Sequence, residues 1–344
     1  MTETITAEAA HDLLGQVVQG TRLDRHQAAD VFTAVGRGLF TPVRTAALLA
    51  ALHSRGEEPQ EVAGAVEAFR AMAVAFPEVP GPVVDTCGTG GDGHHTINIS
   101  TAAALVAASM GITVAKHGNR GVSSRCGSAD IVAALGLPGD QTPEVAAEAL
   151  RRDHFTFLHA QRYHPAMKEV GPVRRDLATP TVFNLLGPLL NPAPLTHQLM
   201  GVSTPAVMGL VADALAALGR RRALVVHGSG LDEIAVHGPT RILDVSAAGV
   251  REVTVTPEDL GVDVHPPADL VGGEARENAA AVRRILDGRG TPAHRDAVAV
   301  NAGAIVHLVG ATDTLAEGVR LAGEHIDSGA PGRHLDAMTG GEGR

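Results

Sequence analysis

A stretch containing Pro77, Pro80 and Pro82 separates two parts of the sequence that have different hydrophobic patterns. Proline cannot continue a helix or pair within a central strand, so regular structure should stop there. Before the prolines, apolar residues recur at helical spacing, whereas after them short β-branched runs are followed by glycine-rich turns. In a chain of 344 residues, this change predicts a helical domain over 1–76 and a larger α/β domain after it.

Capping residues mark where the N-terminal helices begin. Asp24 with Gln27 has the signature of a capping box, so a helix should follow Asp24. Thr41 precedes a proline, in the pattern of a capping hydroxyl with a first-turn proline, and this helix should end at Gly56. Pro59 opens a third helix. Each has an apolar stripe, which predicts that the helices pack against partners.

The remainder of the chain alternates short apolar strands with helices. This alternation is typical of a mainly parallel central sheet flanked by helices, so the strands should be buried. The glycine-rich end, 336–344, is predicted to be a flexible tail. The predicted strands are 83–84, 112–115, 155–158, 198–202 and 223–226, with helices over 101–110 and 205–218.

The composition argues against several classes of protein. No apolar run reaches the roughly 18 residues of a membrane span, so we expect no membrane partner. The N-terminus has acidic residues and no basic stretch before an apolar segment, which predicts a cytoplasmic location. A net charge of −10 would repel the phosphates of a nucleic acid, so none is expected as a partner. Cys87 and Cys126 are too few for a disulfide framework.

A glycine-rich loop, 88–93, follows the first predicted strand of the α/β part, and residues 96–101 lead from it into a helix. Glycines let backbone N–H groups approach an anion, and a helix N-terminus adds partial positive charge. Asn98, Ser100 and Thr101 add side-chain donors, so the loop suits a phosphate. Its spacing is neither the dinucleotide fingerprint nor the P-loop, and a tight turn that merely joins strand to helix is the alternative.

A second polar segment, 116–124, follows the next predicted strand and should lie at the same edge of the sheet. Its cations, amide and hydroxyls suit a charged sugar phosphate, although a solvated loop is the alternative. Asp92 in the glycine loop would repel phosphate unless it faces a cation, a ribose hydroxyl or Lys116. Ser128 could either cap the next helix or bind a ligand.

A third segment, 227–234, follows another apolar strand and contains the adjacent acids Asp232 and Glu233. Carboxylates are ligands for hard cations, although an Asp-Glu pair is more often a solvated surface. A pyrophosphate-like ligand generally travels with magnesium, so these acids are candidate ligands near the phosphate loop. Ser100 could complete one metal site.

A fourth group of residues suits an aromatic carboxylate. Segment 163–168 contains His164, Arg174 follows it, and the apolar run 183–188 comes next. An arginine beside an apolar wall can recognise an aromatic carboxylate. The alternatives are that His164 is a packed or capping histidine and that Arg174 is a surface charge.

Taken in this order, the four segments resemble those of the anthranilate phosphoribosyltransferase family, and the likeness extends from the N-terminal helices to about Gly329. The resemblance implies a small helical domain and a larger α/β domain, with the active site between them and a homodimer formed through the helical domain. It also implies that part of 167–190 returns to the helical domain. The α/β domain would then comprise 77–166 and 191–335.

The resemblance also implies the reaction, in which the phosphoribosyl group of phosphoribosyl pyrophosphate passes to the amino group of anthranilate. The products are N-(5-phosphoribosyl)anthranilate and pyrophosphate, in a step of tryptophan biosynthesis. Two Mg²⁺ ions would accompany the donor, held by Ser100, Asp232 and Glu233. Lys116 and Arg174 would be the catalytic residues, through stabilisation of the leaving pyrophosphate and orientation of anthranilate.

Substrate-binding positions follow from the same resemblance. Anthranilate would be bound by Arg174 with Gly88, Asn119, His117, His164 and Pro188. Departures from the family pattern occur at Arg125, Cys126, Pro180 and Ser229, and none of these is an implied ligand. The positions implied for phosphoribosyl pyrophosphate are Gly88, Gly91, Asp92, Thr96, Asn98, Ile99, Ser100, Thr101, Lys116, His117, Gly118, Asn119, Arg120, Gly121, Val122, Ser123, Ser124 and Ser128.

Two other functions remain as alternatives. A pyrimidine-nucleoside phosphorylase resembles this family in fold, but a Ser-Thr-Gly-Gly loop ending in lysine would be expected, whereas 88–93 reads Gly-Thr-Gly-Gly-Asp-Gly. A non-catalytic relative that binds nucleic acid should have a basic surface and lack Asp232 or Glu233. The acidic charge of this chain argues against the second alternative.

Overall fold

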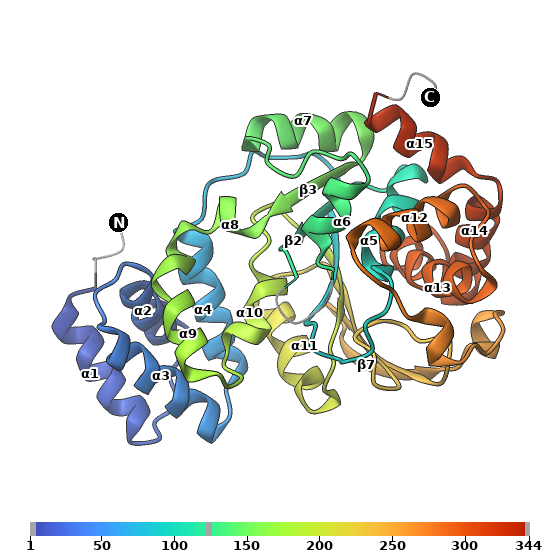
Figure 1. The fold of residues 1–344 in the computed structure, drawn as a ribbon. Helices are drawn as coiled ribbons and strands as arrows, with labels where there is room; N and C mark the ends of the chain where they lie inside the picture. The colour runs from blue at the N-terminus through green and yellow to red at the C-terminus, as the bar shows by residue number, and fades with distance from the viewer. Residues whose placement is uncertain (1–4, 122–125, 341–344) are drawn as a thin grey trace.

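The computed structural model describes residues 5–121 and 126–340. In Figure 1 the N-terminal helices (blue) lie at one side, the sheet in the middle, and the C-terminal helices (orange to red) at the other side. Among the described helices, none is both long enough and apolar enough to cross a lipid bilayer. The N-terminal helices are α1 (Ala7–Val18), α2 (Arg25–Gly36), α3 (Pro42–Arg55) and α4 (Pro59–Ala71).

The N-terminal helices begin where their caps predict. The carboxylate of Asp24 accepts from the backbone N–H of Gln27, whose side chain accepts from the backbone N–H of Asp24, which completes a capping box at α2. The Thr41 hydroxyl accepts from the backbone N–H of Arg44 at the start of α3. After α4, residues 74–80 form neither helix nor strand, as the prolines predict.

Two short helices from the middle of the chain pack against the N-terminal helices (Figure 1). The ring of Phe183 meets the rings of Phe32 and Phe69 edge-to-face, with centroids 6.1 and 5.2 Å away. Apolar residues of 167–190 thereby share one hydrophobic core with α2 and α4, and the same core also contains residues of the sheet such as Val225. These helices are α9 (Gly171–Leu177) and α10 (Phe183–Leu189), preceded by α8 (Ala160–Tyr163).

The central sheet has seven strands in the order β3-β2-β1-β4-β5-β6-β7. Neighbours from β3 through β5 are parallel, and β6 and β7 continue the sheet as an antiparallel hairpin. The predicted α/β class with a mainly parallel sheet is therefore confirmed. The strands are β1 (Val84–Gly88), β2 (Val114–Gly118), β3 (Phe155–His159), β4 (His197–Gly201), β5 (Arg222–Gly228), β6 (Thr240–Ser246) and β7 (Gly249–Val255).

The order of the strands reverses between β1 and β4. From β1 the chain proceeds through β2 to β3 on one side, and the later strands lie on the other side. Gly88 and Gly201, the last residues of β1 and β4, are register partners at this position. Ligands of open α/β sheets bind at the carboxyl ends of strands where the order reverses, so this position is where a site is expected.

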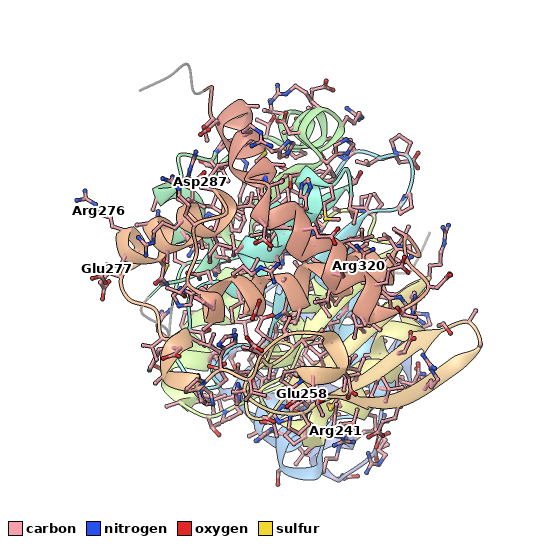
Figure 2. All side chains as sticks on the ribbon, turned by 90° about the vertical axis from the view of Figure 1, so that its right-hand side faces the viewer. Arg241, Glu258, Arg276, Glu277, Asp287 and Arg320 are labelled. Carbon is pink, nitrogen blue, oxygen red and sulfur yellow. The ribbon has the colours of Figure 1, made fainter. Side chains whose placement is uncertain are left out.

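Helices cover both faces of the sheet, and alternate residues of β5 face different cores. Leu224 and Val226 join the core formed with the C-terminal helices, whereas Ala223 and Val225 join the core shared with the N-terminal helices. On the side shown in Figure 2, the charged side chain of Arg276 points away from the molecule. The remaining helices are α5 (Ile99–Ser109), α6 (Ser128–Ala134), α7 (Pro143–Asp153), α11 (Met208–Ala217), α12 (Ala275–Leu286), α13 (Pro292–Leu308), α14 (Leu315–Asp327) and α15 (Ala330–Met338).

Two boundaries beside the reversal point differ from the sequence predictions. The second strand, expected over 112–115, runs to Gly118 and therefore includes Lys116 and His117. The Lys116 ammonium is bonded inside the protein, which allows the strand to continue past residue 115. Helix α5 begins at Ile99 rather than at 101, which places Ser100 and Thr101 in its first turn and Asn98 at its N-cap.

Three expectations outside the strand ends were incomplete or wrong. The hairpin of β6 and β7 was not predicted, because β7 is largely exposed and lacks an apolar run. Residues 205–207 form a 3₁₀ turn, and α11 begins only at Met208. The tail expected over 336–344 is helical to Met338, because Asp336 pairs with Arg283, at 2.9 Å between Nη2 and Oδ2.

Candidate active site

The strand ends at the reversal point carry glycine because Asp232 lies against them. A Cβ on Gly88 would collide with the Asp232 carboxylate, and a Cβ on Gly201 would collide with the backbone of Asp232. The backbone N–H of Gly90 donates to Oδ2 of Asp232 at 2.6 Å, and the backbone N–H of Ser100 donates to Oε1 of Glu233 at 3.1 Å. The fold therefore brings the third predicted segment onto the glycine loop.

The glycine loop has the backbone conformation of an anion-binding turn. Gly90, Gly91 and Gly93 have φ values of 70°, 79° and 76°, which other residues rarely adopt. The Asp92 carboxylate accepts from the backbone N–H of His94 at 3.1 Å, which holds the turn. The buried hydroxyl of Thr101, in the first turn of α5, has no hydrogen-bond partner within the protein. The loop and this helix start can therefore still donate to a ligand.

Asp232 and Glu233 form a buried acidic pair. Burial raises the pKa of both acids, repulsion from Asp92 raises each further, and repulsion from Asp232 also raises the pKa of Glu233. A bound cation would relieve this repulsion. In residues 5–121 and 126–340, no three His, Cys, Asp or Glu side chains are arranged to hold a metal by themselves. Carboxylate oxygens are ligands that Mg²⁺ accepts, usually together with phosphate oxygens and water.

Lys116 places a buried positive charge between the glycine loop and the acids. Its side chain is 2% exposed, and Nζ donates to the backbone oxygen of Thr86 at 2.8 Å and to Oγ of Ser100 at 3.2 Å. The ammonium lowers the pKa of Glu233 and of Asp85, in opposition to the effect of burial. Lys116 can therefore approach an anion bound at the start of α5.

Two buried asparagines support this arrangement and were not predicted as functional residues. Asn191 donates from Nδ2 to the Asp85 carboxylate at 2.9 Å and to the backbone oxygen of Ala115 at 2.7 Å. Asn301 bonds both backbone groups of Ile234 at 3.0 Å, directly after the acidic pair. The sequence feature that could have identified both asparagines is a polar residue within an apolar helix or run. Such a residue must find hydrogen-bond partners when it is buried.

Asp130 of α6 bonds the described residues on either side of 122–125, at the end of the second predicted segment. Its Oδ2 atom accepts from the backbone N–H groups of Gly121 and Gly127, at 3.0 and 2.9 Å. Ser128 does not cap α6, whose N-cap is Gly127; its hydroxyl instead donates to the backbone oxygen of Asn119 at 3.4 Å. Capping was therefore the wrong alternative for Ser128. The predicted positions Val122, Ser123 and Ser124 lie outside the described residues.

The predicted aromatic site contains a pair of buried histidines. The rings of His117 and His164 meet edge-to-face with centroids 5.2 Å apart. Burial lowers the pKa of His117 to about 3 and that of His164 to about 4, so both rings are neutral near pH 7. Pro188 reaches the end of β1 from α10, and its backbone oxygen accepts from the Gln198 side chain at 2.8 Å. The predicted aromatic site therefore combines residues from strand ends with residues from helical segments.

Arg174 belongs to the helical side of this region. Its guanidinium carbon lies 5.7 Å from the ring centroid of Phe183, on the helix that also carries Pro188. Burial lowers the pKa of Arg174, but arginine remains charged at neutral pH. The half-buried guanidinium beside an aromatic ring matches the predicted setting for an aromatic carboxylate.

Comparisons with known proteins identify the family of this chain. Residues 11–73 match the family model described as "Glycosyl transferase family, helical bundle domain", and residues 80–331 match "Glycosyl transferase family, a/b domain". The anthranilate phosphoribosyltransferase of Corynebacterium efficiens is 49% identical over 305 residues, which cover 88% of this chain and 89% of the relative. The enzyme of Corynebacterium aurimucosum is 46% identical over 303 residues, or 88% of each chain. The chain belongs to the anthranilate phosphoribosyltransferase family.

Solved structures of the anthranilate phosphoribosyltransferase family have the same fold. The enzyme from Thermus thermophilus superposes with a TM-score of 0.91 at 44% identity, covering 96% of this chain and 98% of that chain. The Saccharomyces cerevisiae enzyme, solved in complex with phosphoribosyl pyrophosphate and Mg, superposes with a TM-score of 0.88. It is 24% identical and covers 97% of this chain and 98% of its own, so this second likeness concerns the fold.

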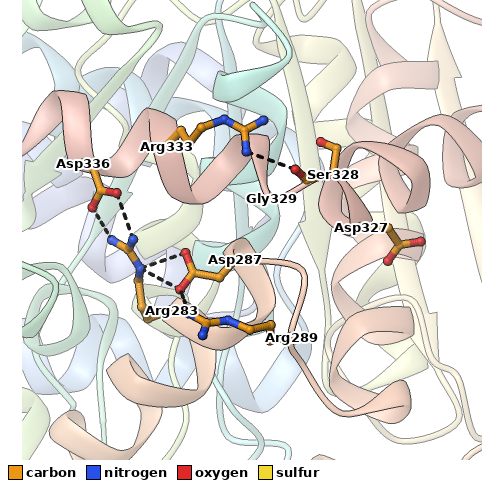
Figure 3. A pocket seen from close by; sticks show the side chains of 8 residues that line it. All are labelled: Arg283, Asp287, Arg289, Asp327, Ser328, Gly329, Arg333 and Asp336. Carbon is orange, nitrogen blue, oxygen red and sulfur yellow. Dashed lines mark hydrogen bonds and ion pairs between the residues drawn. The ribbon is translucent and has the colours of Figure 1, made fainter.

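A charged pocket of about 330 Å³ lies among the C-terminal helices and apart from the family site (Figure 3). Its arginines are already paired: Arg283 bonds Asp336 and Asp287, and Arg289 bonds Asp287 at 2.7 Å. Arg333 donates to the backbone oxygen of Ser328 at 3.1 Å. These ion pairs join α12 to α15, so the pocket is a structural feature of this end of the fold.

The buried histidine pair of this family member predicts a loss of stability in acid. His164 has a pKa of about 4 when folded and about 6.5 when unfolded, so between these values the unfolded chain binds more protons. The contribution of neutral His164 is therefore complete above pH 6.5 and is lost as the pH falls toward 4. The ionisation of His164 should change the unfolding free energy by at most about 1.4 kcal/mol per pH unit.

The measurement is denaturant unfolding of the wild type and of His164→Gln between pH 4.5 and 7.5. Gln stays neutral throughout, so the difference in unfolding free energy between the two proteins should shrink as the pH falls. The comparison isolates His164 from the buried acids, whose raised pKa values act in the opposite direction. Two curves that stay parallel across this range would contradict the neutral state of His164.

Proposed function

We propose that this chain transfers the phosphoribosyl group of phosphoribosyl pyrophosphate to the amino group of anthranilate and releases pyrophosphate. The proposal rests on one observation above all: Lys116, Ser100 and the acids Asp232 and Glu233 meet beside the glycine loop at the reversal point of the sheet. This set of groups suits the binding of a phosphate-containing donor together with a cation. The proposed pathway is tryptophan biosynthesis, as the names of the relatives suggest.

The pyrophosphate end of the donor is proposed to lie against the glycine loop and the first turn of α5. Ser100, Asp232 and Glu233 would hold two Mg²⁺ ions, which when bound would neutralise charge on the pyrophosphate. Support comes from the mutual repulsion of the two acids and from the yeast relative, which was solved with the donor and Mg. The other residues that the family resemblance implies for phosphoribosyl pyrophosphate are also proposed to bind this donor.

Lys116 is proposed to stabilise the negative charge that develops on the leaving pyrophosphate. As the bond between ribose C1 and the pyrophosphate oxygen breaks, a bond forms from C1 to the anthranilate nitrogen, and one amine proton is released. An aromatic amine is neutral near pH 7, so orientation by Arg174 and Asn119 matters more than a general base. The neutral, buried rings of His117 and His164 would shape the anthranilate channel without protonating the amine.

Arg174→Gln is expected to raise KM for anthranilate by about 10- to 100-fold, because a charge-assisted bond to the carboxylate is lost. KM for phosphoribosyl pyrophosphate should stay nearly constant. The neighbouring Arg175 is exposed, so Arg175→Gln is a control with the same change in charge. Steady-state kinetics with each substrate varied in turn make the measurement. An equal rise in both KM values for Arg174→Gln would contradict its assignment to anthranilate.

The decisive test is the fluorescence of anthranilate mixed with the purified chain, phosphoribosyl pyrophosphate and Mg²⁺. Decay that requires both the donor and the cation supports the transferase. Thymidine phosphorolysis without anthranilate consumption would instead favour the phosphorylase, which the matched relatives do not support. Retention on nucleic acid without either reaction would favour a binding protein.

The chain is further proposed to form a cytoplasmic homodimer through its helical domain. Val18 of α1 and Val43 of α3 are 60% and 78% exposed, which leaves apolar side chains on the surface of the N-terminal helices. Light scattering coupled to gel filtration would report the mass in solution. Replacement of both valines by Ser should shift the protein toward the monomer.

A further inference from the structure

A segment that the proposed reaction does not use lies along the glycine loop. Within 270–278, the backbone oxygen of Leu270 accepts from the N–H of Ile97 at 3.0 Å, and the N–H of Gly272 donates to the oxygen of His95 at 2.8 Å. These bonds make a short antiparallel ladder, which fixes the arm that leads from the loop into α5. This segment therefore sets the position of proposed donor-binding residues.

Asn278 extends this contact with a chain of side-chain hydrogen bonds. It lies in the second turn of α12 and is 3% exposed. Its Oδ1 accepts from the backbone N–H of Gly273 at 2.7 Å, and its Nδ2 donates to Oδ1 of Asn98 at 3.0 Å. Asn98 in turn donates from Nδ2 to the backbone oxygen of Cys126 at 3.2 Å. One buried amide thereby connects three segments that are far apart in the sequence.

The direction of these bonds fixes the orientation of the Asn98 side chain. Asn278 must present its N–H because its oxygen is taken by Gly273, so the Asn98 oxygen faces Asn278. The Asn98 nitrogen then faces a carbonyl that it can satisfy. A flip of either amide would place two oxygens or two N–H groups against each other. The remaining N–H group and oxygen lone pair of Asn98, which could bind a ligand, therefore have a fixed orientation.

We propose that Asn278 is a positioning residue for the phosphoribosyl donor: it orients Asn98 and sets the spacing between the start of α5 and Cys126. The inference rests on the proposed function, because Asn98 is a donor-binding residue only in that scheme. Asn278 itself touches Asn98, Gly273 and the thiol of Cys126, and its proposed effect on the reaction passes through Asn98.

Asn278→Asp is the sharpest single test, because the carboxylate keeps the shape of the amide and can still accept from Gly273. In its ionised form it cannot donate to Asn98, so an oxygen would face an oxygen, and a flip of Asn98 would only move the clash to Cys126. Binding is therefore measured at pH 8, where the carboxylate form is favoured. The dissociation constant of phosphoribosyl pyrophosphate, from calorimetry with Mg²⁺, should rise by about tenfold or more. KM for anthranilate at saturating donor should change by less than about threefold.

Arg276→Gln provides the matched control. It lies two residues away on the same helix, points away from the molecule and lowers the net charge by the same amount as Asn278→Asp (Figure 2). Its donor affinity should equal that of the wild type. Thermal unfolding of both variants shows whether the fold is intact. Equal donor affinity in folded Asn278→Asp and in the wild type would overturn the proposal.

A double-mutant cycle separates positioning from a general structural role. If Asn278 acts through Asn98, then Asn278→Ala should weaken donor binding in the wild type but have little further effect in the Asn98→Ala background. Additive losses would show that Asn278 acts independently and would overturn the proposal. Failure of the proposed function has a different signature, since the wild type would then consume no anthranilate and bind no donor.

Discussion

Replacement of Asp232 by Asn together with Glu233 by Gln should lower kcat/KM for phosphoribosyl pyrophosphate by about a thousandfold or more. The proposed site places these two carboxylates where the donor's cations must sit, and their removal deprives the leaving pyrophosphate of its main charge neutralisation. Anthranilate fluorescence, followed over a range of Mg²⁺ concentrations, measures the loss. The residual activity should also lose its saturable dependence on Mg²⁺.

Stability distinguishes loss of the cation site from loss of the fold. Without a cation, burial and mutual repulsion disfavour the ionised forms of both acids, so the metal-free folded state binds more protons than the unfolded state between about pH 4 and 8. Their contribution to stability therefore decreases as the pH rises through this window. Neutral Asn and Gln remove that cost, and the metal-free variant should be at least as stable as the wild type at pH 8.

An exposed acidic pair supplies the control for this variant. Glu258 and Asp259 are adjacent and exposed, so Glu258→Gln with Asp259→Asn changes the net charge equally without approaching the glycine loop. That control should retain wild-type activity and Mg²⁺ dependence. If the Asp232 and Glu233 variant kept more than about a tenth of the wild-type kcat/KM, the assignment of the cation site would be wrong.

The sequence predicted the elements of the site better than the contacts that join them. The glycine loop follows a buried strand, and glycines and a helix start are local signals that a sequence displays. The approach of Asp232 to Gly88 was not predictable, because it depends on two strands meeting at the reversal of the sheet. The pairing register of two strands that are distant in the sequence cannot be read from the residues of either strand.

Lys116 and Asn278 show why pattern alone failed elsewhere. A charged residue at the end of an apolar run reads as the end of a strand, yet β2 continues because the Lys116 ammonium is satisfied by Thr86 and Ser100. Asn278 was not singled out in the sequence, and it is a buried residue of α12. Its function depends on the fold placing α12 beside the glycine loop, which no local periodicity encodes.

Lys116→Met should lower kcat by about 100- to 10,000-fold while changing KM for anthranilate little, because the lost charge acts on the leaving pyrophosphate. The sequence has two lysines, and the other, Lys168, has a side chain that is 77% exposed. Lys168→Met is therefore a control with the same chemistry, and its kinetics should match those of the wild type. Rapid-quench measurement of a single turnover would place the defect in the chemical step.

Lys116→Met also removes the cation nearest to Asp85. A second substitution at Asp85 can therefore test whether the variant loses activity only because its fold is less stable. Asp85 is fully buried and Lys116 lowers its pKa, so Lys116→Met alone leaves a carboxylate whose ionised form costs more. Asp85→Asn in the same chain removes that charge. The double variant should recover the thermal stability that the single variant loses but none of its activity. Recovery of activity together with stability would show that Lys116 acts only by holding the fold, and would contradict its role at the leaving group.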